Sequence, residues 1–273
     1  MSKKEVVVID LGGTHLRIAS VKNGKIINFI RKETSQSKSK LLKQIVEGIK
    51  ECKDEKIDKL GVSCAGIIEN GVIKISSNLP LKNFNLKKYL QNQFRAKIKI
   101  ENDANCVALA EAKYGVKKKD FFILTLGTGI GGGIIIDGKL YKGRGAGGEL
   151  GHIILNNKKD FEYWASSKAF KRVINVEDEE SIKKLVYEKS PRAQKIKKEV
   201  ADYIGQGIAS LVSVFDPEVV VLAGGMRRLG SSFMKDVKNN TKKYCFLPKI
   251  PEIRWSKIDN PGLIGASLLF EKI

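Results

Sequence analysis

The sequence predicts an α/β protein made of two related halves. Short apolar runs typical of buried strands alternate with segments whose apolar residues recur at helical spacing. A buried-strand run, a glycine-rich turn, a second β-like run and an X-Gly turn occur together twice, over residues 6–24 and 121–138. Such repetition is a weak sign of two similar half-chains. Hydrophobic residues make up 42% of the 273 residues, enough for a packed core in one large or two modest domains.

The first glycine turn joins the apolar runs Val6–Ile9 and Leu16–Val21. It therefore lies between two strands, where Gly12 and Gly13 allow backbone N–H groups to approach a ligand closely. Amide groups arranged in this way suit phosphate. The preceding carboxylate, Asp10, can hold a hydrated Mg²⁺. An ordinary hairpin turn is the alternative for this stretch alone.

The second glycine turn, Gly127–Gly133, follows the apolar run Phe121–Leu126 and precedes the β-like run Ile134–Ile136. Two phosphate-binding hairpins that faced each other across a cleft would hold a nucleoside triphosphate.

The other elements follow from the same patterns. Further strands are expected at Lys25–Ile30, Ile57–Ser63, Gly71–Ile75, Ile98–Ile100, Val219–Ala223 and Ile253–Ile258. Helices are expected at Ser39–Cys52, Cys106–Tyr114, Phe161–Ile174, Ile182–Tyr187, Ala193–Phe215, Phe233–Lys243 and Pro261–Phe270. The polar segment Ser76–Asn85, which contains Asn78, is expected to be either a specificity loop or a plain connection.

A polar cluster lies where the strand Ile98–Ile100 gives way to a helix. Ligands of open α/β sheets bind beyond the carboxyl ends of strands, and Asn102, Asp103 and Asn105 occupy this position. One of them is needed to cap the helix. Because one cap is enough, we expect Asp103 to be functional.

Two further polar residues, Glu149 and His152, lie three positions apart in a glycine-rich stretch. Histidine occurs only twice in the chain, so His152 is a candidate ligand residue. A structural histidine is the alternative.

The net charge of +20 comes mainly from lysines scattered along the chain. This scatter favours solvated faces over a nucleic-acid surface. The four cysteines are far apart and form no CxxC pair, which is typical of reduced thiols in a cytoplasmic protein. We expect no secretory signal, because Lys3 and Lys4 lead directly into a core strand. No apolar run is long enough for a transmembrane helix.

Taken in order along the chain, these motifs resemble the ROK family of sugar kinases, within the actin-like ATPase superfamily. The resemblance rests on Asp10–Arg17, Glu101–Asn105, Leu124–Gly133, Gly148–His152 and Val220–Gly225. It implies two actin-like (ribonuclease H-like) domains with a central ATP/sugar cleft. The N-terminal domain would comprise residues 1–102 and 260–273, and the C-terminal domain residues 103–259.

The resemblance also implies a role for each motif. Asp103 would be the catalytic base, and Asp10 would hold Mg²⁺ through water. The residues implied to contact ATP are Gly12, Gly13, Thr14, Gly127, Thr128, Gly129, Gly224 and Gly225. The residues implied to contact the sugar are Gly66, Asn78, Asn102, Asp103, Glu149, His152 and Glu162.

The chain departs from the family at one place. Many members carry a CxCGxxGCxE cluster after the GxxGH segment, and with the histidine it holds a structural zinc. Residues Asn156–Phe161 stand here instead, without a cysteine. A structural zinc normally takes four N or S ligands, so no zinc is expected. Packing by Phe161 and Trp164 is a candidate substitute for holding the loop that carries His152.

The activity implied is transfer of the ATP γ-phosphate to the 6-hydroxyl of a hexose. Glucose is the leading substrate, with N-acetylglucosamine or N-acetylmannosamine as alternatives, and polyphosphate or ADP as alternative donors. A non-catalytic sugar-binding regulator is the alternative of another class. The first core strand starts near Val6, which leaves no room for the N-terminal helix-turn-helix of the family's repressors. We expect a cytoplasmic homodimer that binds neither nucleic acid nor membrane.

Overall fold

The computed structural model describes residues 5–53, 56–174 and 190–271. The helix expected at Ile182–Tyr187 lies outside these residues. The described chain forms two compact units. Unit 1 comprises residues 1–117, 138–147 and 257–273, and unit 2 comprises residues 118–137 and 148–256. The domain boundaries expected from the sequence, after Asn102 and before Asn260, stay a prediction.

Unit 1 is built on a mixed sheet with the strand order β3-β2-β1-β4-β8. The strands are β1 (Val6–Leu11), β2 (His15–Lys22), β3 (Lys25–Glu33), β4 (Lys59–Cys64) and β8 (Lys97–Asn102). β1, β2 and β3 form an antiparallel meander, whereas β1, β4 and β8 run parallel. The carboxyl ends of β1, β4 and β8 therefore meet at one edge of the sheet.

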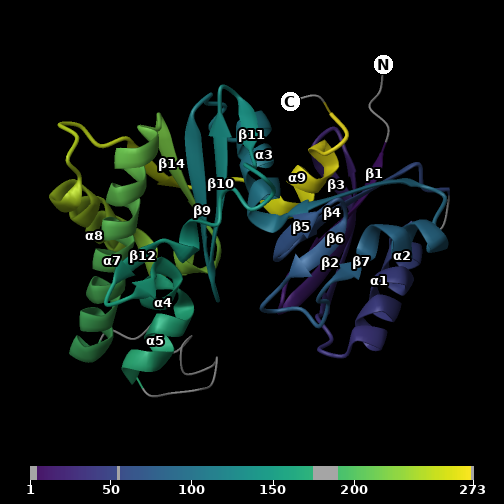
Figure 1. The fold of residues 1–273 in the computed structure, drawn as a ribbon, viewed down its shortest axis with the longest axis horizontal. Coiled ribbons are helices and arrows are strands. Elements are labelled where there is room, and N and C mark those ends of the chain that lie inside the picture. Colours follow the sequence, from purple (N-terminus) through teal and green to yellow (C-terminus); the bar gives the residue numbers. More distant parts are fainter. Residues whose placement is uncertain (1–4, 54–55, 175–189, 272–273) are drawn as a thin grey trace. The chain divides into compact units, whose positions relative to one another are not determined.

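Helices cover both faces of this sheet (Figure 1). They are α1 (Lys38–Cys52), α2 (Leu86–Gln93), α3 (Asp103–Tyr114) and α9 (Pro261–Leu268). Val7 and Ile9 of β1 belong to the core cluster that contains α1 and α2, whereas Val6 and Val8 belong to the cluster that contains α3 and α9. Side chains of a strand alternate between its faces, so burial on both faces accounts for the unbroken apolar run in the sequence.

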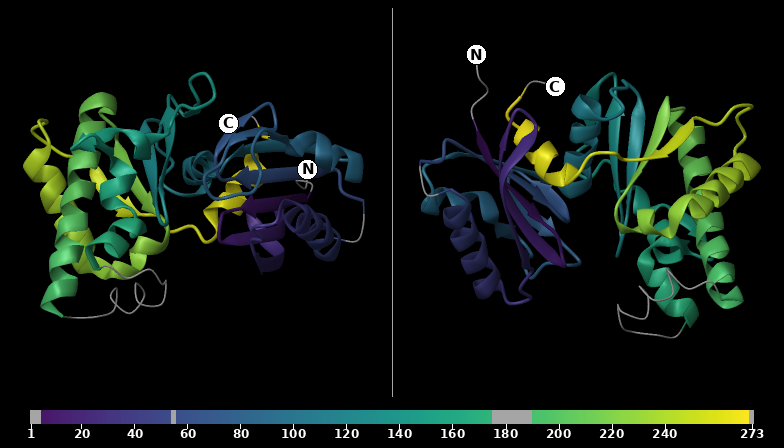
Figure 2. Two further views of the ribbon diagram at one scale, coloured as in Figure 1. Left: turned by 60° about the horizontal axis from the view of Figure 1, so that its bottom comes forward. Right: turned by 180° about the vertical axis from the view of Figure 1, so that it is seen from behind.

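A smaller sheet in unit 1 has the order β5-β6-β7. A further short strand, β11, is not part of this small sheet and directly follows the second half of the sequence repeat. These strands are β5 (Ile67–Glu69), β6 (Val72–Ile75), β7 (Phe84–Asn85) and β11 (Lys139–Tyr141). The C-terminal helix α9 packs directly on β4, because a Cβ at Gly61 would meet the carbonyl oxygen of Ala266 at 2.2 Å. Both views of Figure 2 show this helix, in yellow, beside the purple N-terminal strands.

Unit 2 repeats the same topology. Within the unit, its strands pair in the order β10-β9-β14-β15, with β9 and β10 antiparallel and β9, β14 and β15 parallel. The strands are β9 (Phe121–Leu126), β10 (Ile130–Ile136), β14 (Val219–Ala223) and β15 (Glu252–Trp255). The sequence repeat is therefore also a repeat of topology, and the predicted α/β fold class is confirmed.

The helices of unit 2 are α4 (Phe161–Ala165), α5 (Ser167–Ile174), α7 (Pro191–Phe215) and α8 (Gly230–Tyr244). Two 3-10 turns, η1 (Leu150–His152) and η2 (Gly225–Leu229), and a hairpin of β12 (Ile154–Asn156) and β13 (Lys159–Asp160) complete it. Among the helices of the described residues, none combines the length and apolar character needed to cross a bilayer.

One expectation from the sequence is corrected here, and one helix was missed. The helix expected over Phe161–Ile174 is broken at Ser166, because the N–H of Ser167 donates to the carbonyl of Gly127 and leaves the helical pattern. Helix α2 was not expected at all. It is short, but Asn85 caps it and Leu86 and Leu90, on one helical face, are fully buried.

Candidate functional site

The first glycine hairpin joins β1 and β2, and two of its carbonyl groups accept hydrogen bonds from side chains outside the hairpin. Thr34 Oγ1 donates to the carbonyl of Gly12 at 2.7 Å, and Gln36 Nε2 donates to that of Gly13 at 3.3 Å. A Cβ at Gly13 would meet the Cβ of Asn78 at 2.4 Å. The segment after β6 therefore packs against this hairpin and places Asn78 beside it, and Thr14 completes the turn.

Asp10 lies near the end of β1, and both its carboxylate oxygens are engaged. Oδ2 pairs with Arg17 Nη1 at 2.8 Å, and Oδ1 accepts a hydrogen bond from Ser63 Oγ at 2.9 Å. A Cβ at Gly262, in the first turn of α9, would stand 2.8 Å from Oδ1. This single, bonded carboxylate fits a hydrated Mg²⁺ held through water, the mode of binding that keeps most of the waters of the ion.

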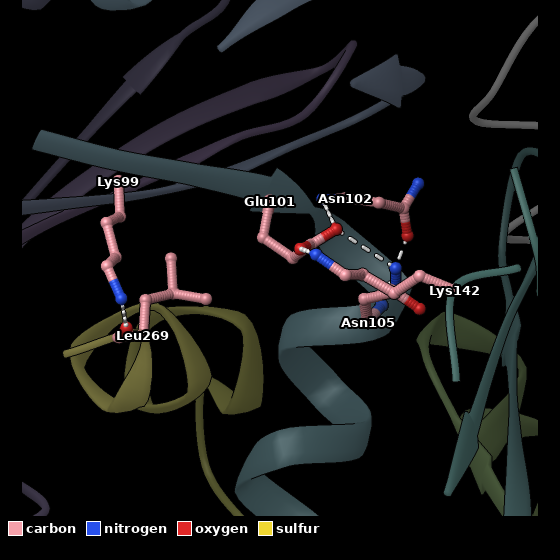
Figure 3. A network of polar contacts seen from close by, with 6 residues as sticks. All are labelled: Lys99, Glu101, Asn102, Asn105, Lys142 and Leu269. Carbon is pink, nitrogen blue, oxygen red and sulfur yellow. Dashed lines mark hydrogen bonds and ion pairs between the residues drawn. The ribbon is translucent and has the colours of Figure 1, made fainter. Parts of the chain in front are cut away.

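The turn from β8 into α3 is organised by the buried carboxylate of Glu101 (Figure 3). Its Oε1 accepts from the backbone N–H of Asn102 at 3.0 Å and from Asn105 Nδ2 at 3.0 Å. Its Oε2 pairs with Lys142 Nζ at 3.2 Å. A buried carboxylate needs such partners. No role is predicted for Glu101 from the sequence, although a charged residue at the end of a strand is a visible signal.

Asn102 is the cap of α3 and also reaches a neighbouring strand end. Its Oδ1 accepts from the N–H of Asn105 at 3.1 Å, and its Nδ2 donates to the carbonyl of Gly66 at 3.0 Å. Gly66 follows β4 with a φ of +115°, and a Cβ there would meet the carbonyl oxygen of Ile75 at 2.2 Å. Only glycine fits this position.

Asp103 is the first residue of α3, and its Oδ1 accepts from the N–H of Ala104 at 3.0 Å. Because Asn102 caps the helix, the carboxylate of Asp103 is not needed for that purpose. A carboxylate in the first helical turn is also favoured by the helix dipole. In unit 1, the predicted residues Asp10, Gly66, Asn102 and Asp103 thus gather at one edge of the sheet.

The second glycine hairpin, in unit 2, joins β9 and β10. The N–H of Gly127 donates to the carbonyl of Gly129 at 3.0 Å across Thr128. Gly224, with a φ of +98°, follows the neighbouring strand β14, and a Cβ there would meet the carbonyl oxygen of Leu126 at 2.5 Å. Gly224 therefore lies beside the end of β9, where the second hairpin begins, and Gly225 is the next residue along the chain.

Glu162, on α4, lies against the second hairpin. Its Oε2 accepts from the N–H of Ile130 at 2.8 Å, and a Cβ at Gly129 would meet the same oxygen at 2.4 Å. The carboxylate also approaches Lys168 Nζ at 3.8 Å. Glu162 thus holds the hairpin in the structure, a contact that the sequence did not predict. Its role as a sugar ligand stays a prediction.

The segment with Glu149 and His152 packs on β10, because a Cβ at Gly151 would meet the carbonyl oxygen of Ile130 at 2.0 Å. Burial raises the pKa of Glu149, an effect that His152 opposes and Glu162 reinforces. His152 Nδ1 lies 2.9 Å from Asp160 Oδ2, and this hydrogen bond raises the pKa of His152, against the effect of burial. The three predicted residues Glu149, His152 and Glu162 are therefore electrostatic neighbours.

Residues Asn156–Phe161, which replace the cysteine cluster, include the tip of the β12–β13 hairpin. Asn157 and Lys158 both have left-handed φ angles, of 48° and 59°, as a two-residue hairpin turn requires. Within the described residues, no three His, Cys, Asp or Glu side chains are grouped so that they could hold a metal ion. The donors at His152 therefore do not fit a structural zinc.

Comparison with known proteins identifies the family. In an alignment 315 positions long, gaps included, the chain is 29% identical to a glucokinase of Thermotoga maritima, covering 100% of this chain and 99% of that protein. It is 29% identical to a xylose repressor of Caldicellulosiruptor bescii, covering 91% of this chain and 73% of that protein. Its fold matches the structure of a ROK family glucokinase from Streptomyces griseus in complex with glucose and AMPPNP. The TM-score is 0.87 at 23% identity, with 97% of this chain and 99% of that chain covered.

The similar proteins thus include glucokinases and a repressor. A sequence model of the ROK family matches residues 6–273, nearly the whole chain. The chain therefore belongs to the ROK family, and it lacks the cysteine cluster that many members carry.

Proposed function

We propose that the protein is an ATP-dependent sugar kinase that transfers the γ-phosphate to the 6-hydroxyl of a hexose, with glucose as the leading acceptor. The observation that carries the proposal is the turn between β8 and α3. There Asn102 performs the capping, and the carboxylate of Asp103 stands at the helix start without being required as the cap. The glucokinase of Thermotoga maritima, similar over its whole length, supports this assignment.

In the proposed reaction, Asp103 accepts the proton of the 6-hydroxyl as this oxygen attacks the γ-phosphorus. The bond from phosphorus to the bridging oxygen breaks, and ADP leaves. Phosphoryl transfer depends mainly on positioning and on charge stabilisation, so a carboxylate within hydrogen-bond reach of the hydroxyl is a sufficient base.

The glycine hairpins would bind the phosphates, with Gly12, Gly13 and Thr14 from unit 1 and Gly127, Thr128 and Gly129 from unit 2. Gly224 and Gly225 would border the adenosine. Mg²⁺, held through water by Asp10, would neutralise charge on the phosphate oxygens.

The sugar would be held by contacts of its hydroxyl groups with polar groups of the protein. These are Gly66, Asn78, Asn102, Asp103, Glu149, His152 and Glu162. Several hexoses offer these hydroxyl groups, so N-acetylglucosamine and N-acetylmannosamine are the next acceptors to test. We further propose a cytoplasmic homodimer.

The test is an ADP-release assay with ATP and Mg²⁺ against a panel of hexoses and N-acetylhexosamines. We expect turnover with at least one sugar, and loss of at least about 100-fold in kcat for Asp103→Asn, the range that general-base catalysis supplies. Asp236→Asn, a carboxylate on α8 outside the proposed site, is the matched control and should keep wild-type activity.

The similarity to a xylose repressor supports one competing function, that of a non-catalytic regulator. That function predicts sugar binding without turnover, with any donor. Polyphosphate and ADP are therefore included as donors, with sugar phosphate as the measured product because neither donor releases ADP. Absence of turnover with all three donors would overturn the kinase proposal.

A further inference from the structure

One carboxylate, that of Asp160, makes two contacts beside the loop that carries His152. Asp160 Oδ2 lies 2.9 Å from His152 Nδ1. Asp160 Oδ1 accepts from the N–H of Tyr163 at 2.8 Å and so caps α4. Asp160 therefore connects the end of η1, where His152 lies, to the helix that carries Glu162.

The hairpin that presents Asp160 is itself fixed to α4 and α7. Trp164 Nε1 donates to the carbonyl of Asn156 at 3.0 Å, and the Trp164 ring stacks on Tyr203 with centroids 4.8 Å apart. The N–H of Phe161 donates to the carbonyl of Ile153 at 2.8 Å, and the Phe161 side chain is fully buried. The position of Asp160 is thus set by packing and hydrogen bonds on both sides.

A carboxylate at one ring nitrogen determines what the other nitrogen can do. With Asp160 at Nδ1, this nitrogen carries the proton in the neutral ring, and Nε2 is the acceptor. When the ring is protonated, Nε2 becomes a donor. In both states Asp160 also fixes the plane of the ring, so a sugar hydroxyl would meet Nε2 at a constant place.

We propose that Asp160 is a positioning residue for sugar binding: by holding His152 Nδ1 it replaces the zinc ion of family members with the cysteine cluster. This inference rests on the proposed function, because His152 is taken as a sugar-contacting residue. It makes two statements about this chain. Sugar binding needs the carboxylate of Asp160, and it needs no zinc.

The first test compares Asp160→Asn with Asp160→Ser. Both residues are good N-caps, so both variants should retain the cap of α4. In Asp160→Asn, with its oxygen kept on the Tyr163 N–H, an amide N–H₂ would face Nδ1 and favour the opposite tautomer of His152. Serine is too short to reach the ring.

We expect both variants to raise the KM for sugar by about 10- to 100-fold, the size of effect known for losing a residue that orients a metal-ligating histidine. The KM for ATP should change less than about twofold, because the glycine hairpins are untouched. The ring ¹⁵N chemical shifts of His152 should show a change of tautomer in Asp160→Asn. The shifts of His15, the only other histidine, should stay constant.

The second test is metal analysis and chelation. We expect less than about one zinc per ten chains, and unchanged sugar affinity after treatment with a zinc-selective chelator, since four N/S ligands are lacking. Stoichiometric zinc with loss of sugar binding on chelation would overturn the inference.

The inference is also overturned if both Asp160 variants keep the wild-type KM for sugar and the wild-type tautomer of His152. Failure of the proposed function looks different. The tautomer would still change in Asp160→Asn, but no sugar would be phosphorylated by the wild type. The ¹⁵N measurement therefore separates the two failures.

Discussion

Replacing Asn102 tests whether the turn into α3 is held as the structure indicates. Asn102→Ala removes two hydrogen bonds, one to the N–H of Asn105 and one to the carbonyl of Gly66. Loss of an N-cap costs about 1 kcal/mol, and loss of a neutral hydrogen bond costs about 1 kcal/mol more. We therefore expect the free energy of unfolding of unit 1 to fall by about 2 kcal/mol.

Asn102→Ser separates the two contributions, because serine keeps a capping oxygen but lacks the amide that reaches Gly66. Its expected loss is about 1 kcal/mol, half that of alanine. The assay is urea unfolding followed by far-UV circular dichroism and by tryptophan fluorescence. Both tryptophans, Trp164 and Trp255, belong to unit 2, so a transition of unit 1 alone moves only the dichroism curve.

A free energy of unfolding for Asn102→Ala within about 0.5 kcal/mol of the wild type, the usual range of a neutral surface change, would contradict the role of these two hydrogen bonds. Equal losses in the serine and alanine variants would show that the cap contributes nothing.

Three further predictions concern other positions. Gly66→Ala should lower the urea midpoint more than Asn102→Ala does, because a φ of +115° and a Cβ contact of 2.2 Å with Ile75 exclude a side chain. In native protein, Cys245 should be the one thiol that reacts quickly with a disulfide reagent, since the other three are buried. Protonated His152 should make its full contribution to the free energy of unfolding below about pH 6.5. This contribution should be lost as the pH rises through the raised pKa of His152. Comparison of urea midpoints with His152→Gln across this pH range measures that loss.

Each of these has a clear contrary result. A Gly66→Ala protein with the wild-type midpoint would mean that the chain does not pass through the left-handed region there. A second fast thiol would contradict the burial of Cys64 and Cys106, whose pKa values burial raises, or of Cys52, where burial raises the pKa to about 11. A stability difference between wild type and His152→Gln that grows with pH would contradict the hydrogen bond to Asp160.

The strands and glycine hairpins could be predicted because their signal is local. The run Val6–Ile9 is apolar at successive positions since both faces of the sheet are covered, and Gly12 and Gly13 mark the turn directly. The repeated pattern at residues 121–138 then predicted the second sheet, with the same arrangement of antiparallel and parallel strands.

What could not be predicted depends on contacts between distant segments. The break at Ser166 arises where Ser167 bonds to Gly127, some forty residues earlier, and no local pattern encodes that bond. The role of Asp160 depends on the approach of His152 across a hairpin whose turn, Asn157-Lys158, contains no glycine. Only the capping task of Asp160, directly before a helix, was visible in the sequence.

The contacts of two carboxylates, Glu101 and Glu162, could not be predicted either. Glu101 belongs to the motif that predicted the site, yet its task is to bond Asn102, Asn105 and Lys142, and the last of these is distant in sequence. Glu162 was expected to contact sugar through the family resemblance, whereas its position on Gly129 and Ile130 emerges only from the fold.

Phosphorylation of a sugar panel with ATP and Mg²⁺ by wild type, Asp103→Asn and Asp236→Asn is the decisive measurement. We expect turnover with a hexose, most strongly glucose, retained in Asp236→Asn and reduced at least about 100-fold in Asp103→Asn. Equal turnover in wild type and Asp103→Asn would contradict the assignment of the base. Sugar binding without turnover by the wild type, with ATP, ADP or polyphosphate as donor, would contradict the kinase itself.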